Sequence, residues 1–293
     1  GFNPLPRGFR IPGPTEKNFW DIPEGISRPS GEADLAFMSI PELASLIRSG
    51  EISCLALTEF FLHRLKEHDP QLHCVITLTE EYAIGQARKL DAELADGHDR
   101  GILHGIPYGA KDLFSFPGYP TTWGAEAYRE QVLDETSGVI RKLADAGAVL
   151  VAKTTLGALA MGDVWYADTT RNPWNPEEGS SGSSAGSASA TAAGLLPFAI
   201  GTETWGSIVS PSTRCGTTGL RPTYGRVTRA GAMALSWTMD KAGPICRSAR
   251  DCAIVFDFIR GPDPLDQTLI EAGYSYPGEI NLSQLKIGYL EGV

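Results

Sequence analysis

The sequence predicts an α/β fold, in which helices alternate with the strands of a central sheet. Residues 106–111 have the composition of a short strand, and residues 148–152 form a second, fully apolar strand. Between them, residues 137–146 show the apolar spacing of an amphipathic helix that Gly147 ends. A strand, a crossover helix and a second apolar strand are typical of a βαβ unit in an α/β fold.

Residues 1–35 are predicted to form an extended arm that lies on the body of the protein. Six prolines fall within the first 30 residues, and this composition disfavours both helix and sheet. Helices begin after this arm, with Ser39 and Ser53 as predicted N-caps. Apolar residues then recur at every fourth position, namely Leu57, Phe61 and Leu65. A further helix is predicted over about residues 80–94.

Residues 179–194 contain only Gly, Ser, Ala and Thr, and they have two interpretations. Their composition alone indicates a flexible linker. However, the segment leads directly into apolar residues 195–200, and its second half is rich in alanine, which favours helix. We therefore predict a tight backbone followed by a buried helix.

The composition is that of an ordinary globular protein, long enough at 293 residues to bury a substantial core. The 25 Lys and Arg against 35 Asp and Glu give a net charge of −10, which argues against direct binding to nucleic acid. No apolar run approaches the roughly 18 residues of a membrane span. Localisation is left open between the cytoplasm and export after removal of a signal peptide.

The five cysteines are odd in number and widely spaced, and none forms a C-x-x-C pair. The sequence therefore predicts small buried thiols rather than a disulfide framework or a zinc site. Neither metal-ligand spacing nor a P-loop is found, so we expect no metal, nucleotide or organic cofactor.

Serine is the candidate nucleophile, because six serines crowd into residues 180–189 and Ser207 follows. Serine needs a base to take its proton. Residues 182–186 match the G-x-S-x-G elbow of α/β-hydrolases, but that fold places its histidine after the serine. All five histidines here lie before residue 105, so the base must be a lysine or a carboxylate.

Lys111 is the best-placed lysine, since it stands at the end of a predicted buried strand. Burial there would depress its pKa and leave a neutral amine able to accept a proton. The competing interpretation is an ordinary surface lysine at a strand end.

The segments around Lys111, Ser183 and Ser207, with residues 215–227 (CGTTGLRPTYGRV), resemble the amidase signature family of serine amidohydrolases. Supporting segments are residues 152–155 (AKTT), 170–174 (TRNPW) and 239–245 (MDKAGPI). The likeness runs from about Ser39 to the C-terminus. It implies a central mixed β-sheet covered on both faces by helices.

The resemblance implies a Ser–cis-Ser–Lys triad, with Lys111 as base, Ser183 as bridging serine and Ser207 as nucleophile. The spacing to Ser207 selects Ser183 over Ser181 or Ser184, and Ser184 remains a candidate for supporting the triad. The family holds the bridging serine after a cis peptide bond, here that between residues 182 and 183.

Backbone N–H groups of Thr204, Trp205, Gly206 and Ser207 are the oxyanion donors that the resemblance implies. Glu203 followed by Thr204 resembles the T-E-T-x-G-S-I branch of the family. Trp205 is less expected beside such a hole. It either packs as one more aromatic or forms a wall of the acyl pocket.

Asp112 would raise the pKa of Lys111 if the two side chains were close. Neighbouring residues of a strand face opposite sides, so we expect Asp112 to point away.

Three aromatic residues are candidates for lining an apolar substrate site, although aromatic residues more often lie in the core. They are Trp123, Trp165 and Tyr166.

The leading prediction is therefore an amidase acting on a small or lipophilic carboxamide. One alternative is the glutaminase subunit of a glutamine-dependent amidotransferase, which passes ammonia to a partner. Another is an inactive scaffold, in which Trp205 or truncation abolishes turnover.

The resemblance also implies that residues 36–293 form the first part of an amidase signature domain. Strands near the end are then expected to leave unpaired edges and exposed apolar surface. We expect the remainder of the domain to come from the same or another chain, and a homo-oligomer is possible.

Overall fold

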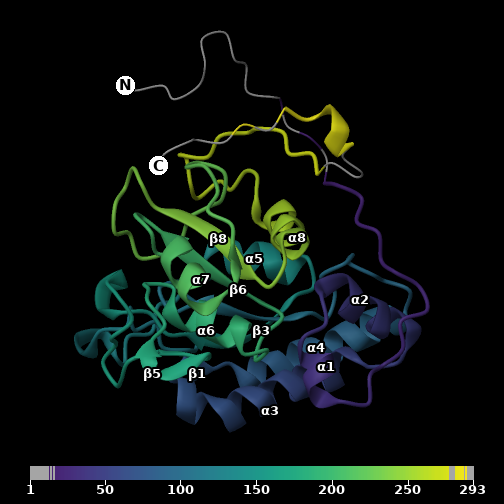
Figure 1. The fold of residues 1–293 in the computed structure, drawn as a ribbon, viewed down its shortest axis with the longest axis horizontal. Helices are drawn as coiled ribbons and strands as arrows, with labels where there is room; N and C mark the ends of the chain where they lie inside the picture. Colours follow the sequence, from purple (N-terminus) through teal and green to yellow (C-terminus); the bar gives the residue numbers. More distant parts are fainter. Residues whose placement is uncertain (1–12, 14, 16, 277–280, 287, 289–293) are drawn as a thin grey trace.

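The centre of the protein is a six-stranded mixed sheet with the strand order β1-β3-β2-β6-β8-β7. The computed structural model describes residues 13, 15, 17–276, 281–286 and 288 (Figure 1). Strand β2 runs parallel to β3 and β6, whereas β1 pairs antiparallel with β3, and β8 pairs antiparallel with β6 and β7. The predicted α/β class and mixed sheet are confirmed.

The sheet strands are β1 (Val75–Leu78), β2 (Pro107–Lys111), β3 (Val149–Thr154), β6 (Phe198–Glu203), β7 (Thr218–Gly219) and β8 (Lys241–Cys246). Strands β4 (Arg171–Asn172) and β5 (Asn175–Gly179) form a separate pair. The α-helices are α1 (Glu32–Ala36), α2 (Ile40–Ser49), α3 (Cys54–Leu72), α4 (Glu80–Ala95), α5 (Gly138–Asp145), α6 (Ala185–Ala192), α7 (Val209–Cys215) and α8 (Ala249–Ile259). Short 3-10 turns are η1 (Glu126–Tyr128), η2 (Ala158–Ala160) and η3 (Leu282–Gln284).

Helices cover both faces of this sheet, as the alternation of side chains along β8 shows. Ile245 packs with Ala188 and Ala192 of α6 on one face. Cys246, the next residue, lies beside Cys252 of α8 on the other face. Successive strand residues point to opposite faces, so α6 and α8 lie in different layers.

Helices α2 and α3 begin where the sequence predicts. Ser39 caps α2, and the Glu42 carboxylate accepts its backbone N–H at 2.8 Å, as in a capping box. Ser53 caps α3 by accepting the Ala56 N–H at 3.0 Å. The predicted apolar positions of α3 are buried, namely Leu57, Phe61 and Leu65.

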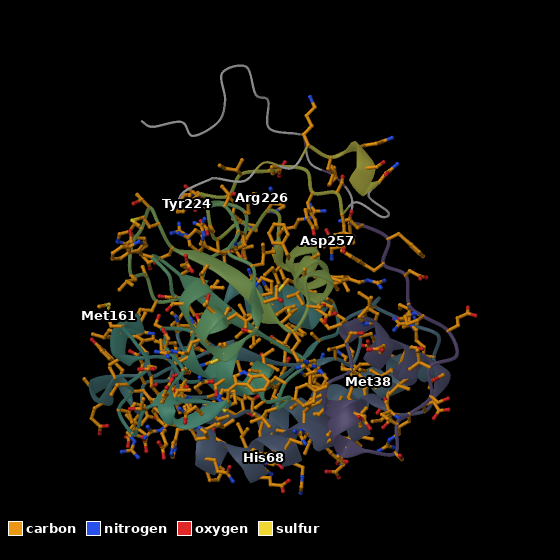
Figure 2. The ribbon with its side chains drawn as sticks, viewed as in Figure 1. Met38, His68, Met161, Tyr224, Arg226 and Asp257 are labelled. Atoms are coloured by element: carbon orange, nitrogen blue, oxygen red, sulfur yellow. The ribbon has the colours of Figure 1, made fainter. Side chains whose placement is uncertain are left out.

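The predicted arm ends earlier than residue 35, because α1 begins at Glu32. Glu32 and Asp34 place acidic side chains in the first turn, where they stabilise the helix N-terminus. Ahead of α1, the Asn18 backbone N–H and the Trp20 indole N–H donate hydrogen bonds to the Asp257 carboxylate of α8 at 2.7 and 3.0 Å. Asp257 is labelled in Figure 2. Residues 1–12, 14 and 16 of the predicted arm lie outside the described residues.

Helix α6 is buried along its whole length, so the linker interpretation of residues 179–194 is wrong. A β-carbon on Gly186 would lie 2.1 Å from the Cys74 carbonyl oxygen. The small residues therefore let the helix approach the neighbouring backbone closely. The predicted helix over residues 80–94 is α4, and the predicted βαβ unit is β2, α5 and β3.

All five cysteines are free and buried, as predicted. Among the described residues, no helix is long and apolar enough to span a membrane. The same part of the chain contains no group of three or more His, Cys, Asp or Glu residues that could hold a metal ion.

Candidate active site

The candidate site forms where the carboxyl ends of two neighbouring parallel strands meet. Lys111 is the last residue of β2, and Thr202 lies near the end of β6, which pairs with β2. Ligands of α/β sheets bind outside the carboxyl ends of such strands. The loop that carries Ser183 precedes α6 and reaches the same place.

Lys111 is fully buried, and its side-chain nitrogen contacts three hydroxyl groups. Nζ lies 2.7 Å from Ser183 Oγ, 3.0 Å from Thr202 Oγ1 and 3.2 Å from Ser184 Oγ. These partners are neutral, so none of them compensates a buried positive charge. The structure thus brings Lys111 together with the predicted bridging serine, Ser183, and with Ser184. Within the described part of the chain, no hydrogen bond joins either of these hydroxyls to that of Ser207.

Burial lowers the pKa of Lys111 to about 7. The negative charges of Asp240 and Glu203 act in the opposite direction, because they favour the charged amine, but desolvation is the larger effect. A large fraction of the lysine is therefore neutral near pH 7, and its lone pair can take a proton from a neighbouring hydroxyl.

Asp112 points away from Lys111, as predicted. Its carboxylate lies 2.6 Å from Lys153 Nζ and accepts the backbone N–H and hydroxyl of Thr122 at 2.7 and 2.6 Å. Burial raises the pKa of this carboxyl, and the charge of Lys153 opposes that rise. Asp112 therefore belongs to a separate buried ion pair behind the site.

The peptide bond between Gly182 and Ser183 is cis, which agrees with the pattern that the resemblance implies. A β-carbon on residue 182 would lie 1.9 Å from the Gly162 carbonyl oxygen, so only glycine fits there. The next residue, Ser184, donates its backbone N–H to the Ser207 carbonyl at 3.1 Å. This bond joins the loop of Ser183 to the segment of Ser207.

Ser207 lies half-buried in the turn between β6 and α7, and Glu203 supports that turn. The Glu203 carboxylate accepts the N–H groups of Ile208 and Val209 at 2.9 and 3.0 Å. Within the described part of the chain, the backbone N–H groups of residues 204–207 have no hydrogen-bond acceptor. The turn therefore presents unpaired donors beside the Ser207 hydroxyl, which an anion could accept.

A cavity of about 280 Å³ contains both Ser183 and Ser207 in its wall. Apolar side chains form much of the rest, including Leu113, Phe114, Met233, Leu235, Trp237 and Leu265. Charged side chains also reach the lining, namely Arg229, Asp240, Lys241 and Asp266. The cavity can hold a small, largely apolar group against the two serines.

The structure does not place the three predicted pocket residues at this cavity. Its described lining does not include Trp123, Trp165 or Tyr166. Trp123 packs on Tyr128, with ring centroids 4.6 Å apart, and Trp165 packs edge-on against Tyr166 at 4.9 Å. These rings therefore contact one another instead of the site.

Trp205 was predicted either to pack as one more core aromatic or to form a wall of the acyl pocket. Neither prediction holds, because its side chain is 91% exposed. It neither packs into the core nor lines the cavity in the described structure. It projects from the turn that carries Ser207.

Two further residues at the site were not predicted from local patterns. Thr202 contacts Lys111 because β6 lies beside β2, and its only signal is its position at a strand end five residues before Ser207. Asp240 lines the cavity and accepts the Thr204 hydroxyl at 2.5 Å. It belongs to a segment that the resemblance singled out, but nothing local indicates its partner.

Comparisons with known proteins point to one family. A sequence model of the family described as Amidase matches residues 56–293. A glutamyl-tRNA(Gln) amidotransferase subunit of Hahella chejuensis is 42% identical over 233 residues, which cover 78% of this chain and 48% of that protein. The protein of the same name in Acinetobacter baumannii is 41% identical over 241 residues, covering 81% of this chain and 49% of that protein.

Solved structures agree with this assignment. The peptide amidase of Stenotrophomonas maltophilia superposes with a TM-score of 0.76 at 37% identity, covering 83% of this chain and 51% of that chain. A bacterial aryl acylamidase of the amidase signature family superposes with a TM-score of 0.75 at 28% identity, covering 81% of this chain and 50% of that chain. The chain spans about half the length of the curated relatives it matches.

Proposed function

Since the chain belongs to the amidase signature family, we propose that it hydrolyses a carboxamide C–N bond through an acyl-enzyme on Ser207. Ser183 acts as proton relay and Lys111 as base. The observation that carries this proposal is the 2.7 Å contact between a buried amine of lowered pKa and Ser183, in the wall of the cavity that also contains Ser207.

The reaction begins with neutral Lys111, which accepts the hydroxyl proton of Ser183. Ser183 in turn accepts the proton of Ser207, whose oxygen attacks the amide carbonyl carbon. The carbonyl π electrons move to oxygen and give a tetrahedral oxyanion. When the C–N bond breaks, the relay returns the proton to the leaving nitrogen. Water then attacks the acyl-enzyme along the same relay and releases the acid.

The unpaired backbone N–H groups of residues 204–207 support an oxyanion hole in this turn. Such donors act where the negative charge develops, and losing one typically costs about 2.7–4 kcal/mol in the transition state. Ser184 and Thr202 hold Lys111 in place and do not take part in proton transfer.

The cavity lining favours an apolar acyl group. Leu235, Trp237 and Leu265 offer apolar contact, and a small cavity of this kind suits a small or lipophilic carboxamide. Comparing the rates of hydrolysis of hexanamide and glutamine, by ammonia release, tests this preference.

A second candidate is a glutaminase role in a glutamine-dependent amidotransferase. The names of the two amidotransferase relatives, at 41–42% identity, favour it. Ammonia release from glutamine that rises when partner proteins and an acceptor are added would support this role over a free-standing amidase.

Apolar side chains exposed beside the cavity support a covering polypeptide. Trp237 and Leu265, which line the cavity, are 79 and 70% exposed. Trp205 and Met161, which follow the lining residues Thr204 and Ala160 in the chain, are 91 and 70% exposed, and Met161 lies at the periphery of the molecule (Figure 2). Large exposed apolar patches mark interaction sites. We propose that further polypeptide, from the same or another chain, covers this rim in the active assembly.

The proposed nucleophile is tested by mass spectrometry after treatment with an alkyl fluorophosphonate, in which the serine oxygen displaces fluoride from phosphorus. We expect one adduct, mapped to Ser207, that Lys111→Ala and Ser183→Ala abolish. Ser181→Ala is the matched control, because the Ser181 hydroxyl contacts Ser210 instead of Lys111. An adduct on another serine would refute the assignment, and a protein inert in its complete assembly would be the inactive scaffold.

A further inference from the structure

One carboxylate joins the wall of the cavity to the turn of Ser207. Asp240 is 9% exposed, and its Oδ1 accepts the Thr204 hydroxyl at 2.5 Å. Its other oxygen, Oδ2, accepts the backbone N–H groups of Leu235 and Ser236 at 2.7 and 2.9 Å. Hydrogen bonds to a charged acceptor are stronger than those between neutral groups. Each oxygen therefore holds a different segment of the site.

The Thr204 side of this connection has a second support. Lys241 Nζ donates to the Thr204 carbonyl at 3.0 Å, and Lys241 pairs with Glu203 between β8 and β6. Asp240 and Lys241 are consecutive residues, so the start of β8 holds Thr204 through both its hydroxyl and its carbonyl. Thr204 opens the turn whose unpaired N–H groups lie beside Ser207.

The wall side is a short turn that faces the cavity. Leu235 and Trp237 line the cavity, and the Met239 and Asp240 N–H groups bond back to the Ser236 carbonyl at 3.2 and 3.1 Å. Tyr224 donates its hydroxyl to the Trp237 carbonyl at 2.9 Å. An acyl group in the cavity would thus press on a turn that is tied to Asp240.

We propose that Asp240 is a positioning residue that couples the Leu235–Trp237 wall to the Thr204–Ser207 turn. This inference rests on the proposed amidase function for its catalytic consequence. An acyl group that fills the wall stabilises the arrangement in which Asp240 holds Thr204, and the donors beside Ser207 then keep their geometry. Binding energy from a remote part of the substrate thereby raises the rate at the reacting carbon.

Coupling of this kind is reciprocal, so it can be tested without any substrate. Thr204→Val removes the hydroxyl bond to Asp240 and leaves the carboxylate in place. In amide hydrogen exchange on the 293-residue chain, we expect this variant to speed exchange about fivefold or more in residues 234–239, which Asp240 links to Thr204. Thr204→Ser should restore the slow exchange, because it keeps the hydroxyl.

Thr213→Val is the matched control for that experiment. The Thr213 hydroxyl donates to the Val209 carbonyl within α7, and its loss should leave residues 234–239 unchanged. Thr204→Val that leaves exchange in residues 234–239 at the wild-type rate would overturn the inference, whatever the activity of the protein.

The catalytic consequence is tested with ethyl and octyl fluorophosphonates on the wild-type chain in its active assembly. We expect Thr204→Val and Asp240→Asn to lower the maximal labelling rate of the octyl probe about tenfold more than that of the ethyl probe. An equal loss for both probes would show that Asp240 is only structural and would overturn the inference. If neither probe labels the wild type, the proposed function fails, and the exchange experiment still decides the coupling.

A pH profile separates charge from geometry. Asp240 and Glu203 are the carboxylates whose charges raise the pKa of Lys111. The labelling rate should rise with pH as Lys111 loses its proton. Asp240→Asn removes one negative charge, which lowers the pKa of Lys111 further, so this rise should occur at lower pH. Thr204→Val keeps both charges, so the rise should occur at the same pH as in the wild type. An equal shift in both variants would contradict an electrostatic effect of Asp240 on Lys111.

Discussion

Two lysines lie fully buried on neighbouring parallel strands, Lys111 in β2 and Lys153 in β3. Lys111 contacts three neutral hydroxyls, and burial lowers its pKa to about 7. Lys153 lies 2.6 Å from the Asp112 carboxylate and donates to the Thr121 hydroxyl and the Pro120 carbonyl, both at 3.1 Å. The two residues share a type, a strand environment and a degree of burial, but their partners differ.

Burial alone therefore does not distinguish the proposed base, Lys111, from Lys153, and the difference lies in their partners. The three hydroxyls around Lys111 are neutral and do not compensate the desolvation of its charged amine, so Lys111 releases its proton near neutral pH. A carboxylate at 2.6 Å instead supplies the opposite charge that a buried ammonium needs. We expect Lys111 to act in catalysis and Lys153 to stabilise the fold.

The largest expected effect is on activity, and it comes from Lys111→Met. Loss of a general base typically lowers the rate by about 10²–10⁴-fold. The free energy of unfolding should change less than in Lys153→Met, because the three groups that contact Lys111 are neutral and its loss leaves no contacting carboxylate buried without a partner. Amide hydrolysis by the active assembly gives the rate, and a variant with more than a tenth of wild-type activity would exclude Lys111 as the base.

Lys153→Met should show the opposite pattern. It leaves the Asp112 carboxylate buried without its ion-pair partner, which typically costs about 3–5 kcal/mol. Urea denaturation of the chain measures this loss in unfolding free energy. The double variant Asp112→Asn with Lys153→Met should recover part of it, because the orphaned charge is gone. Equal stability of the single and double variants would contradict the role of the pair.

The pH dependence sharpens the comparison further. Since the pKa of Lys111 is lowered to about 7, the neutral amine increases as the pH rises through that value. The labelling rate of Ser207 should therefore rise through about pH 7 and level off above it. Stopped-time fluorophosphonate labelling across this range provides the profile. A rate independent of pH around 7 would refute Lys111 as the titrating base.

The smallest expected effect on the rate comes from Ser184→Ala. This variant removes the longest of the three hydroxyl contacts to Lys111, together with two hydrogen bonds between Ser184 and the Thr202 backbone. A hydrogen bond is typically worth about 0.5–1.5 kcal/mol, and only one of the three involves Lys111, so the rate should fall only several-fold. Ser183→Ala is the comparison variant, since it breaks the proposed relay and should approach the loss seen with Lys111→Met. Equal losses at both serines would leave their roles undistinguished and contradict the assignment of Ser183 as the bridge.

Local patterns predicted much of the fold. The N-caps at Ser39 and Ser53, the helix α5 and the strands β2 and β3 depend on residues that are close in sequence. The buried position of Lys111 follows from its place at the end of an apolar strand. Alanine content likewise predicted the helix α6 within a segment that resembles a linker.

Aromatic residues show the limit of this reasoning. A large ring indicates a preference for burial, but it carries no information about which neighbour it packs on. Trp123 packs on Tyr128 and Tyr166 packs on Trp165, and none of these rings lines the cavity of the described structure, whereas Trp205 is exposed. Trp237, which does line the cavity, has no local signal to separate it from them.

The sequence by itself determined the types and order of the elements, the absence of a histidine after the serines, and the identity of the candidate lysine. Only the tertiary structure decided which groups meet Lys111 and which meet Lys153. Thr202 reaches Lys111 because β6 lies beside β2, and Asp240 reaches Thr204 because β8 lies beside β6. Such contacts join residues far apart in the chain, and the pairing of strands that creates them leaves no local pattern.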